Sequence, residues 1–501
     1  MLLFILLLPL LLLIPLVLVL VQQRRTLHRV GKGGANASLS SKKLKVYGFF
    51  HPYCSGGGGG ERVLWKMIQV LQQQQEKGCN KNSNNTINRI VIFTIDSPDV
   101  DEAQLRSDAQ KRFDVAIPYP VQLISLECHK DCLDPSPYLS LVLESWGTMK
   151  LAYHALQAYY VQNSEDLDVF CDTTGCAFTF AVVKWFLPAC KILAYVHYPT
   201  ISTDMMSWEW SQSSKSVWKR QLKLVYFSMF AMAYGIVGSF ADLVMVNSTW
   251  TYNHIRSLWW WCSDIDIVYP PCRVPSKEAN SLQQDLRQKR KPIIVSVGQF
   301  RPEKDHRLQI EAFAHFLQTY GGSSNDEGGC RNKIDDVQLW LIGSCRNEQD
   351  QGRVKELQEF ASQKGLLTNS TNDASAGNEH SKVAFKINLP YTELEESMKC
   401  AAVGIHTMRQ EHFGIGIVEM MSAGLLTIAH NSGGPKTDII EPNVTGFLAT
   451  TSKEYADCIH KALSLDTDKS NDMRQKARLS SDRFSDSAFD EHLLKSLAKI
   501  Q

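Results

Sequence analysis

The residue types best suited to chemistry surround a glycine-containing turn in the last quarter of the chain. Glu411 and Glu419 lie eight positions apart and bracket Gly414 and Gly416, after an apolar run at 403–407 that predicts a strand. A helix that begins at such a turn directs N–H groups and its positive dipole end at an anion, while carboxylates accept hydrogen bonds from sugar or ribose hydroxyls. The pattern indicates a site for an anionic, sugar-containing ligand. Two surface glutamates beside an ordinary helix start are the alternative.

A second glycine-rich segment lies near the start of the chain. An apolar run at 44–50 ends at His51, five consecutive glycines occupy 56–60, and a helical pattern covers 61–71. Strand, glycine loop and helix in this order are typical of the opening of an α/β domain. The loop lacks the Gly-Lys-Ser/Thr ending of a P-loop, so a P-loop ATPase is disfavoured.

The elements that would position these segments form two series. In each series apolar runs alternate with helical stretches, which predicts a parallel sheet wrapped by helices, and a proline pair at 270–271 with a charged stretch at 277–291 separates the two. The predicted strands are 44–50, 90–95, 121–126, 169–171, 192–197 and 243–246, then 293–297, 339–342, 383–387, 403–407 and 426–429. Two α/β domains with a cleft between them are expected. Polar stretches at 321–329 and 369–381, and at 72–75 together with the asparagine-rich stretch after it, predict surface loops.

These patterns also set the expected boundaries. The expected divisions are a transmembrane anchor at 1–21, a linker at 22–43, a first Rossmann-like domain at 44–275, a joint at 276–291, a second Rossmann-like domain at 292–475 and a C-terminal helix at 476–501.

Composition and charge exclude several classes of protein. The 501 residues include 53 Lys and Arg against 52 Asp and Glu, and 44% are hydrophobic, which is typical of a globular chain of two or three domains. The balanced charge does not favour a general nucleic-acid surface. The 13 cysteines are scattered singly, as reduced cytosolic thiols usually are. One Cys128-His129-x-x-Cys132 segment and short Asp-x-Asp pairs are weak metal signals, so no metal site is predicted.

The first 21 residues form a different kind of segment. Residues 2–21 are apolar throughout, long enough at about 1.5 Å per residue to cross the roughly 30 Å core of a bilayer. Arg24, Arg25 and Arg29 follow, and positive charge resists transfer, so the bulk of the chain is expected on the cytosolic side. A cleaved signal peptide is the alternative, but it would have a shorter apolar core and a cleavage site close by.

A second apolar stretch lies at 224–240. Lys219, Arg220 and Lys223 precede it, and several tryptophans lie further upstream. A basic, aromatic flank beside an apolar helix suits a membrane interface or a re-entrant element. A buried core helix fits the pattern equally well, so both interpretations stay open.

Several of these segments carry a family resemblance. The stretch 411–419 resembles the E-x7-E signature of family-four retaining glycosyltransferases, which have the GT-B fold. The glycine loop with Glu61 and Arg62, the segment Tyr195-Val196-His197-Tyr198-Pro199 and the segment 298–305 resemble the family's N-terminal glycine loop, central histidine segment and basic loop. The resemblance covers about residues 44–490. It implies an α/β GT-B fold, with an acceptor-side Rossmann-like domain followed by a nucleotide-sugar domain.

Within this family the resemblance is narrower still. Segments at 51–54, 196–204, 295–304 and 430–435 resemble alpha-1,2-mannosyltransferases that extend dolichol-linked oligosaccharides. The resemblance implies transfer of the fourth and fifth mannoses from GDP-mannose to a dolichyl-diphosphate oligosaccharide. It further implies a place on the cytosolic face of the endoplasmic reticulum membrane, with other mannosyltransferases of the same pathway as candidate partners.

The same resemblance assigns residue roles. Glu411 would contact hydroxyls of the donor mannose, Glu419 the ribose, and Arg301 with Lys304 the diphosphate. The expected catalytic residues are His197, Glu411, Arg301 and Lys304, and the expected donor-binding residues are Gly56, Gly57, Gly58, Arg301, Lys304, Glu411, Phe413, Gly414, Ile415 and Glu419. Many members carry Arg where this chain has Gln299, so Arg301 would supply that charge instead. Cations and the helix start would neutralise the diphosphate, so neither a metal nor another cofactor is expected.

Two other functions remain as alternatives. One is a GT-B transferase that acts on a different lipid-linked acceptor. The other is a membrane-tethered scaffold without catalysis, which the joint presence of Glu411, Glu419, Lys304 and His197 disfavours. No second carboxylate can be placed as a nucleophile, so attack on the face from which the leaving group departs is the route that the resemblance implies.

Overall fold

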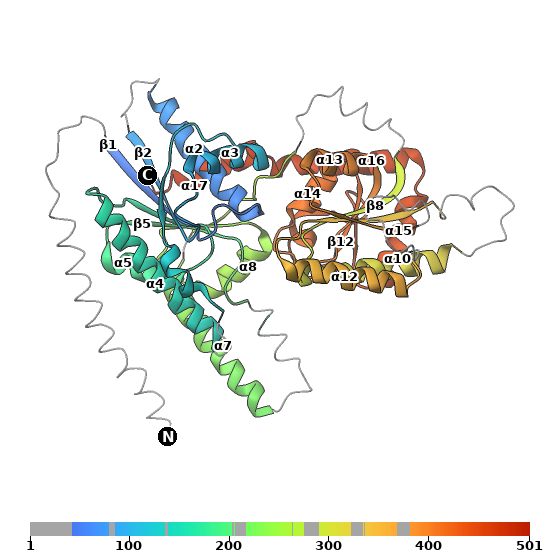
Figure 1. The fold of residues 1–501 in the computed structure, drawn as a ribbon, viewed down its shortest axis with the longest axis horizontal. Helices are drawn as coiled ribbons and strands as arrows, with labels where there is room; N and C mark the ends of the chain where they lie inside the picture. The colour runs from blue at the N-terminus through green and yellow to red at the C-terminus, as the bar shows by residue number, and fades with distance from the viewer. Residues whose placement is uncertain are drawn as a thin grey trace. The chain divides into compact units, whose positions relative to one another are not determined.

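The computed structural model describes residues 43–500 except for 80–85, 136–138, 203–204, 206–216, 263, 275–289, 322–333, 335 and 368–380. Within this part the chain forms two compact units. The first holds the described residues up to 247 together with 251–268 and 492–500, and the second holds 248–250 and 269–491. Each unit is a parallel β-sheet with helices on its faces (Figure 1).

The first unit is built on a seven-stranded sheet with the strand order β3-β2-β1-β4-β5-β6-β7. Its strands are β1 (Lys43–Phe50), β2 (Thr86–Thr94), β3 (Gln122–Ser125), β4 (Val169–Asp172), β5 (Lys191–Val196), β6 (Leu243–Val246) and β7 (Ile265–Ile267). The short strands β4 and β6 are buried at every position, because helices cover both faces of the sheet. The chain reverses its direction of travel across the sheet between the neighbouring strands β1 and β4.

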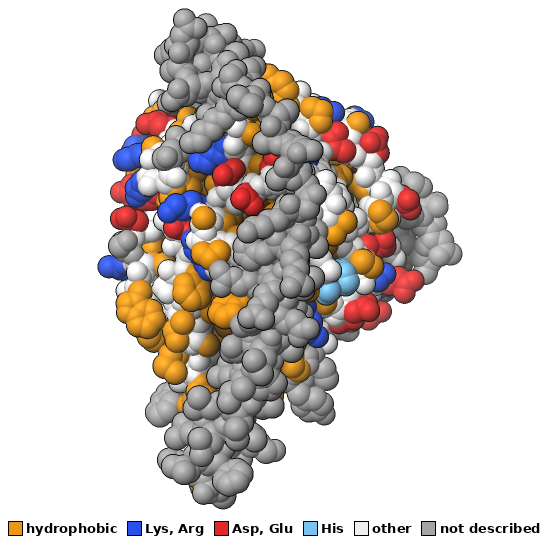
Figure 2. Space-filling view, turned by 90° about the vertical axis from the view of Figure 1, so that its left-hand side faces the viewer, with side chains coloured by type: hydrophobic (Ala, Val, Ile, Leu, Met, Phe, Trp, Pro, Cys, Tyr) orange, Lys and Arg blue, Asp and Glu red, His pale blue; other side chains and the backbone are white. Residues whose placement is uncertain are grey.

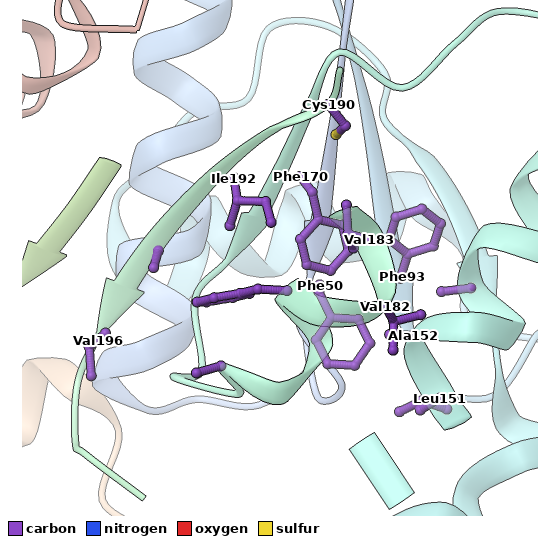
Figure 3. Packing of buried hydrophobic residues seen from close by; sticks show 14 of the residues in the cluster. Phe50, Phe93, Leu151, Ala152, Phe170, Val182, Val183, Cys190, Ile192 and Val196 are labelled. Carbon is purple, nitrogen blue, oxygen red and sulfur yellow. The ribbon is translucent and has the colours of Figure 1, made fainter. Parts of the chain in front are cut away.

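Helices lie on both faces of this sheet (Figure 1). They are α2 (Gly59–Cys79), α3 (Glu102–Phe113), η1 (Glu127–Leu133), α4 (Ser140–Gln162), α5 (Phe178–Phe186), α7 (Val217–Gly238) and α8 (Thr249–Leu258). Figure 3 shows part of the core between the sheet, α4 and α5, where Phe50, Phe93 and Phe170 from three neighbouring strands lie close to Val183. Full burial of one such aromatic side chain is worth roughly 1.5–3 kcal/mol. The carboxyl ends of these strands therefore extend from a tightly packed core.

The second unit is built on a six-stranded sheet with the order β10-β9-β8-β11-β12-β13. Its strands are β8 (Lys291–Val297), β9 (Gln338–Gly343), β10 (Val383–Ile387), β11 (Ala401–Ile405), β12 (Leu426–His430) and β13 (Phe447–Ala449). Here the chain reverses its direction of travel between β8 and β11, which pair directly. Both units therefore have the arrangement in which open α/β sheets bind ligands, beside the carboxyl ends of two strands at a reversal point.

Helices cover this second sheet on both faces as well (Figure 1). Its helical segments are η2 (Pro302–Lys304), α10 (His306–Tyr320), α12 (Glu348–Gln363), α13 (Tyr391–Cys400), α14 (Ile415–Ser422), η3 (Pro435–Ile439), α15 (Ser452–Ser464), α16 (Thr467–Ser481) and η4 (Asp482–Phe484). The last helix, α17 (Asp486–Leu497), begins in the second unit, and its residues from 492 onward belong to the first. One core cluster joins the sheet to α10, α12 and α15, and another joins it to α13, α14 and α16.

The predicted α/β class with two parallel-sheet, Rossmann-like domains is confirmed. The surface loop predicted at 72–75 is wrong, because α2 continues to Cys79. Gln72 is buried there, and its amide group exchanges two hydrogen bonds of 3.0 Å with the backbone of Tyr119. Strands β7 and β13 were not predicted, since three residues carry no measurable periodicity.

Several expectations fall outside the described residues. These are the transmembrane anchor at 1–21, nearly all of the linker at 22–43, most of the joint at 276–291, and most of the loops at 321–329 and 369–381. The expected C-terminal helix at 476–501 corresponds to the end of α16, η4 and α17 in the described part.

Candidate active site

The carboxyl ends of β8 and β11 bring together the charged residues of the second unit. β8 leads through Gly298 into the short turn η2, which ends at Lys304. β11 leads into His406 and then Glu411. Because β8 and β11 are neighbours at the reversal point, residues that lie 107 positions apart in sequence meet at one sheet edge.

Glu411 is the centre of this cluster. Its Oε2 atom lies 2.5 Å from Lys304 Nζ and 3.1 Å from His406 Nε2, and its side chain is only 12% exposed. Burial alone would raise the pKa of Glu411, but the Lys304 ammonium and the His406 ring outweigh it and hold this pKa far below the usual 4.5. Burial lowers the pKa of His406, so at neutral pH this ring is uncharged and donates from Nε2.

Hydrogen bonds fix the two loops to each other. Thr407 Oγ1 donates a bifurcated hydrogen bond to the backbone oxygens of Lys304 and Asp305, at 2.8 and 3.0 Å. Gln309 Nε2 in turn donates to Thr407 Oγ1 at 2.9 Å. The position of Lys304 relative to Glu411 is therefore set by the backbone as well as by the ion pair.

The predicted helix start after Glu411 is present. α14 begins at Ile415. Its N-cap residue, Gly414, has φ +114°, a backbone conformation that residues with a side chain rarely adopt. A Cβ at Gly414 would also lie 2.8 Å from Ile417 Cδ1. Glu411 precedes the helix and Glu419 lies just over one turn inside it, half-buried, as the spacing predicted.

A second pair of glycines packs against the backbone of the turn that contains Glu411. Gly433 and Gly434 follow β12, and the Gly434 N–H donates to the Glu411 carbonyl at 2.8 Å. A Cβ on Gly433 would approach the Glu411 carbonyl oxygen to 2.3 Å, and one on Gly434 would lie 2.7 Å from the backbone of Phe413. Only glycine lets these two segments pack so closely. The two glycines lie in the segment 430–435 that carries the narrower resemblance, but neither they nor His406 was predicted as a site residue.

Arginines occupy the opposite end of α14. Arg290 Nη2 donates to the Ala423 carbonyl at 2.6 Å, and Arg478 Nη2 donates to the same oxygen at 3.3 Å. Arg474 Nε donates to the Gly424 carbonyl at 3.0 Å. The carbonyl end of α14 is thus covered by three guanidinium groups.

Arg301 is placed differently from Lys304. It precedes η2, its side chain is 42% exposed, and its Nη1 atom lies 3.9 Å from Glu303 Oε1. Such an exposed pair contributes little to stability, so the guanidinium can reorient at low cost.

In the first unit, the carboxyl ends of β1, β4 and β5 form the corresponding edge. His51 follows β1 and Thr173 follows β4, and His51 Nδ1 lies 2.6 Å from Thr173 Oγ1. Burial lowers the pKa of His51 to about 4 and raises that of Asp172, the last residue of β4, to about 6. His197 follows β5, and a Cβ on Gly60 would lie 3.7 Å from His197 Nε2 and 3.9 Å from His51 Cε1.

The glycine loop beside this edge is held by carboxylates. Asp96 accepts hydrogen bonds from Ser55 N at 3.0 Å and from Ser55 Oγ at 2.8 Å. Glu61 Oε2 accepts from Gly58 N at 2.8 Å, and a Cβ on Gly56 would collide with the same carboxyl group. Gly57 has more open surroundings, with Arg112 Nη1 at 3.8 Å from an added Cβ. In the part of the chain that the structure describes, no group of three or more His, Cys, Asp or Glu side chains is arranged to hold a metal.

Comparison with known sequences decides the family. Residues 44–259 match the family model described as ALG11 mannosyltransferase N-terminus, and residues 277–480 match glycosyl transferases group 1. A GDP-Man:Man(3)GlcNAc(2)-PP-Dol alpha-1,2-mannosyltransferase of Xenopus laevis is 40% identical over 95% of this chain and 90% of its own length. The human protein of that name is 38% identical over 96% of this chain and 91% of its own length. The chain belongs to this mannosyltransferase family.

Several solved structures have the same fold as this chain. HepE of Anabaena, solved with UDP and glucose, is 18% identical and has a TM-score of 0.55, covering 90% of this chain and 99% of its own. Sucrose-phosphate synthase of Thermosynechococcus elongatus is 16% identical with a TM-score of 0.59, covering 91% and 99%. At these identities the similarity concerns the fold alone. It confirms the GT-B architecture, and membership of the family makes the chain a glycosyltransferase.

Proposed function

We propose that this protein transfers mannose from GDP-mannose to a dolichyl-diphosphate-linked oligosaccharide and forms alpha-1,2 linkages for the fourth and fifth mannoses. The proposal rests above all on similarity that runs through both units to relatives of this name from vertebrates, a slime mould, fungi and a nematode. The buried Lys304–Glu411–His406 cluster supports it, because an intact charged site is not expected in a scaffold that has lost catalysis.

The second unit would hold the donor. Glu411 Oε2 is engaged by Lys304 and His406, so its Oε1 atom is the one assigned to hydroxyls of the donor mannose. Glu419, half-buried inside α14, is assigned to the ribose. Backbone N–H groups of Phe413, Gly414 and Ile415 at the helix start would meet the sugar or phosphate.

Positive charge would act on the leaving group. Lys304 and Arg301 come from the same short turn after β8, and we assign both to the diphosphate. Negative charge grows on the departing nucleotide in the transition state, so a fixed cation there lowers the barrier. With these cations and the helix start in place, we propose a reaction that needs no metal or other cofactor.

The first unit would act on the side of the acceptor. Gly56, Gly57 and Gly58 lie in the loop that Asp96 and Glu61 fasten, and we assign this loop to donor binding together with the second unit's residues. His197 is assigned a place near the transferred mannose. Configuration would be retained by attack on the face from which the nucleotide leaves, with the acceptor proton passing to the leaving phosphate.

Location follows from the proposed acceptor. A dolichyl chain remains in a bilayer, so the enzyme would work at the endoplasmic reticulum membrane with both units on the cytosolic face. Residues 1–21 would form a single-span anchor, and other mannosyltransferases of the pathway are candidate neighbours. The boundaries at 44–275 and 292–475 are proposed for the acceptor-side and nucleotide-sugar domains.

A transfer assay tests this function. Full-length protein with GDP-mannose and the dolichol-linked trimannosyl acceptor should give products one and then two mannoses larger, both removable by an alpha-1,2-mannosidase. UDP-glucose with the same acceptor serves as the donor control. Transfer to another lipid-linked acceptor only would support the alternative GT-B function. Absence of transfer with every donor, together with no thermal stabilisation by GDP-mannose, would favour the scaffold.

A further inference from the structure

Gln410, the residue before Glu411, has an unusual backbone conformation. Its φ is +54°, in the left-handed region that glycine adopts readily, that Asn and Asp adopt less often and that other residues rarely adopt. Four of the described non-glycine residues with positive φ are Asp or Asn, so only two are of an unfavourable type for this conformation. The full set is Asp114, Leu139, Asp305, Asn388, Gln410 and Asn443.

The two unfavourable positions, Leu139 and Gln410, differ in their surroundings. Leu139 is a surface residue at the start of α4, 60% exposed, and Figure 2 shows hydrophobic side chains gathered in the lower part of the view. Gln410 is half-buried and is followed directly by Glu411, the carboxylate at the centre of the charged cluster. Strained backbone that the surrounding structure holds in place is characteristic of functional sites. A contact must therefore hold Gln410 in this conformation.

Ser432 provides that contact. The Gln410 N–H donates to Ser432 Oγ at 2.8 Å, and Ser432 Oγ lies 2.8 Å from Nδ1 of His430, the last residue of β12. Burial, followed by the nearby charge of Arg409, lowers the pKa of the His430 ring, so the ring is neutral at pH 7. A neutral ring nitrogen can accept from the Ser432 hydroxyl while the oxygen of that hydroxyl accepts from Gln410.

A second hydrogen bond from the same segment reaches Glu411 itself. The Gly434 N–H donates to the Glu411 carbonyl at 2.8 Å, so residues 432–434 hold the backbone on both sides of the peptide bond between Gln410 and Glu411. The two hydrogen bonds have different consequences. The Gly434 bond fixes a carbonyl group, whereas the Ser432 bond opposes rotation of φ at Gln410, which would turn the chain that leads into the Glu411 side chain.

We propose that the His430–Ser432 pair acts as a latch, which holds Gln410 in its left-handed conformation and thereby positions the Glu411 carboxylate for the donor sugar. Ser432 and His430 are positioning residues, because they act through the backbone of Gln410 and not on the substrate. The inference rests on the proposed role of Glu411 in binding the donor mannose. It gives the strain at Gln410 a function, since a carboxylate held in place before the donor arrives needs no reordering during the reaction.

Removal of the latch is the first test. Ser432→Ala removes the acceptor of the Gln410 N–H, so Gln410 should relax and Glu411 should move. The kcat for mannose transfer should fall roughly 10- to 100-fold, as a displacement of about 1 Å can cause. Backbone hydrogen exchange at residues 411–413, followed by mass spectrometry on the full-length protein without donor, should become roughly tenfold faster.

A second substitution at position 410 separates backbone strain from ordinary loss of packing. In the Ser432→Ala background, Gln410→Gly should recover most of kcat and most of the protection from exchange, because glycine adopts φ +54° without the latch. Gln410→Ala in the same background is the matched control. It removes the rest of the side chain but keeps the β-carbon, so it should recover neither quantity.

Each other outcome contradicts a specific part of the proposal. Equal recovery by glycine and alanine would mean that the β-carbon at position 410 is irrelevant and would overturn the latch. Unchanged exchange in Ser432→Ala would do the same. Faster exchange with unchanged kcat would show that the latch does not position Glu411. If the unsubstituted chain transfers no mannose from GDP-mannose, the proposed function fails, and the exchange rates alone decide whether the latch exists.

Discussion

The two sheet edges at the reversal points share a backbone plan and differ in charge. At the first, the buried His51 and Asp172 have pKa values displaced toward their neutral forms, to about 4 and about 6. At the second, Glu411 is displaced the other way and stays ionised against Lys304. Burial acts on both edges alike, and the difference lies in how far a nearby charge offsets it: Asp96 offsets it only in part at His51, whereas Lys304 and His406 outweigh it at Glu411.

This difference in charge bears on the donor site proposed above. At the first edge, His51 Nδ1 and Thr173 Oγ1 lie 2.6 Å apart and are hydrogen-bonded to each other, and both residues are buried. At the second edge, the ammonium of Lys304 lies against the carboxylate of Glu411, and a hydrogen bond from Thr407 to the Lys304 carbonyl fixes their relative position. A nucleoside diphosphate sugar carries its anionic charge and its hydroxyls close together, which matches the second arrangement. Three substitutions probe this contrast, in order of decreasing effect.

The largest effect is expected from Lys304→Ala. Loss of the ammonium removes the cation that we assign to the diphosphate and leaves Glu411 buried beside His406 alone, so kcat/KM for GDP-mannose should fall roughly 100- to 1,000-fold. Steady-state kinetics measure this. Lys399→Ala removes another cation from the same unit, one that pairs with Glu395 at 2.7 Å on the exposed surface, and should leave kcat/KM nearly unchanged. Equal losses in both variants would show that the second edge is not charge-dependent.

A smaller effect is expected from His406→Leu. The variant keeps the volume and removes the 3.1 Å donor to Glu411, so the carboxylate loses one of its two supports. Affinity for GDP-mannose should drop roughly tenfold, while affinity for GDP stays the same, because Glu411 is assigned to the sugar. His406→Gln places an amide N–H near the former Nε2 position and should recover most of the loss. Calorimetric titration of both ligands distinguishes this positioning role from general destabilisation, which would lower both affinities.

The smallest effect concerns the neutral edge. Burial raises the pKa of Asp172 from 3.8 to about 6, so the folded chain holds a proton that the unfolded chain has released. Stability contributed by this group therefore falls as the pH rises from about 4 to 6 and is level above that range. Asp172→Asn should gain roughly 1 kcal/mol relative to the unsubstituted chain between pH 5 and pH 7.

Urea midpoints at the two pH values measure the effect of Asp172→Asn. Asp472→Asn, on the exposed surface of α16, is the control and should show no such pH dependence. A gain that is equal at pH 5 and pH 7 would mean that Asp172 is ionised at both and that the first edge is charged after all.

Much of the fold could be predicted because apolar runs and buried strands coincide. The bounds predicted for β6 and β10 are those observed, and Glu411 and Glu419 lie on either side of the helix start as their spacing indicated. The glutamines at 72–75 misled the prediction, because a buried amide satisfied by the Tyr119 backbone looks identical in sequence to a solvated one.

The site was predicted less completely, for physical reasons. Contact between Lys304 and Glu411, which lie 107 positions apart, depends on the pairing of β8 with β11, and no local pattern carries that information. His406 is a lone histidine after a strand, with no spacing to a partner that would mark it. Residue roles came from family resemblance, and they remain proposals that the substitutions above address.

The arginines at the rear of α14 have a consequence for the field at its front. An eight-residue helix is about 12 Å long, so the partial negative charge at its carbonyl end would ordinarily offset much of the attraction felt by an anion near Gly414. Arg290, Arg474 and Arg478 cancel that opposing pole. For the diphosphate that we propose to bind near Gly414, this short helix would act almost as a single-ended source of positive potential, and arginines a full helix length away would contribute to its binding.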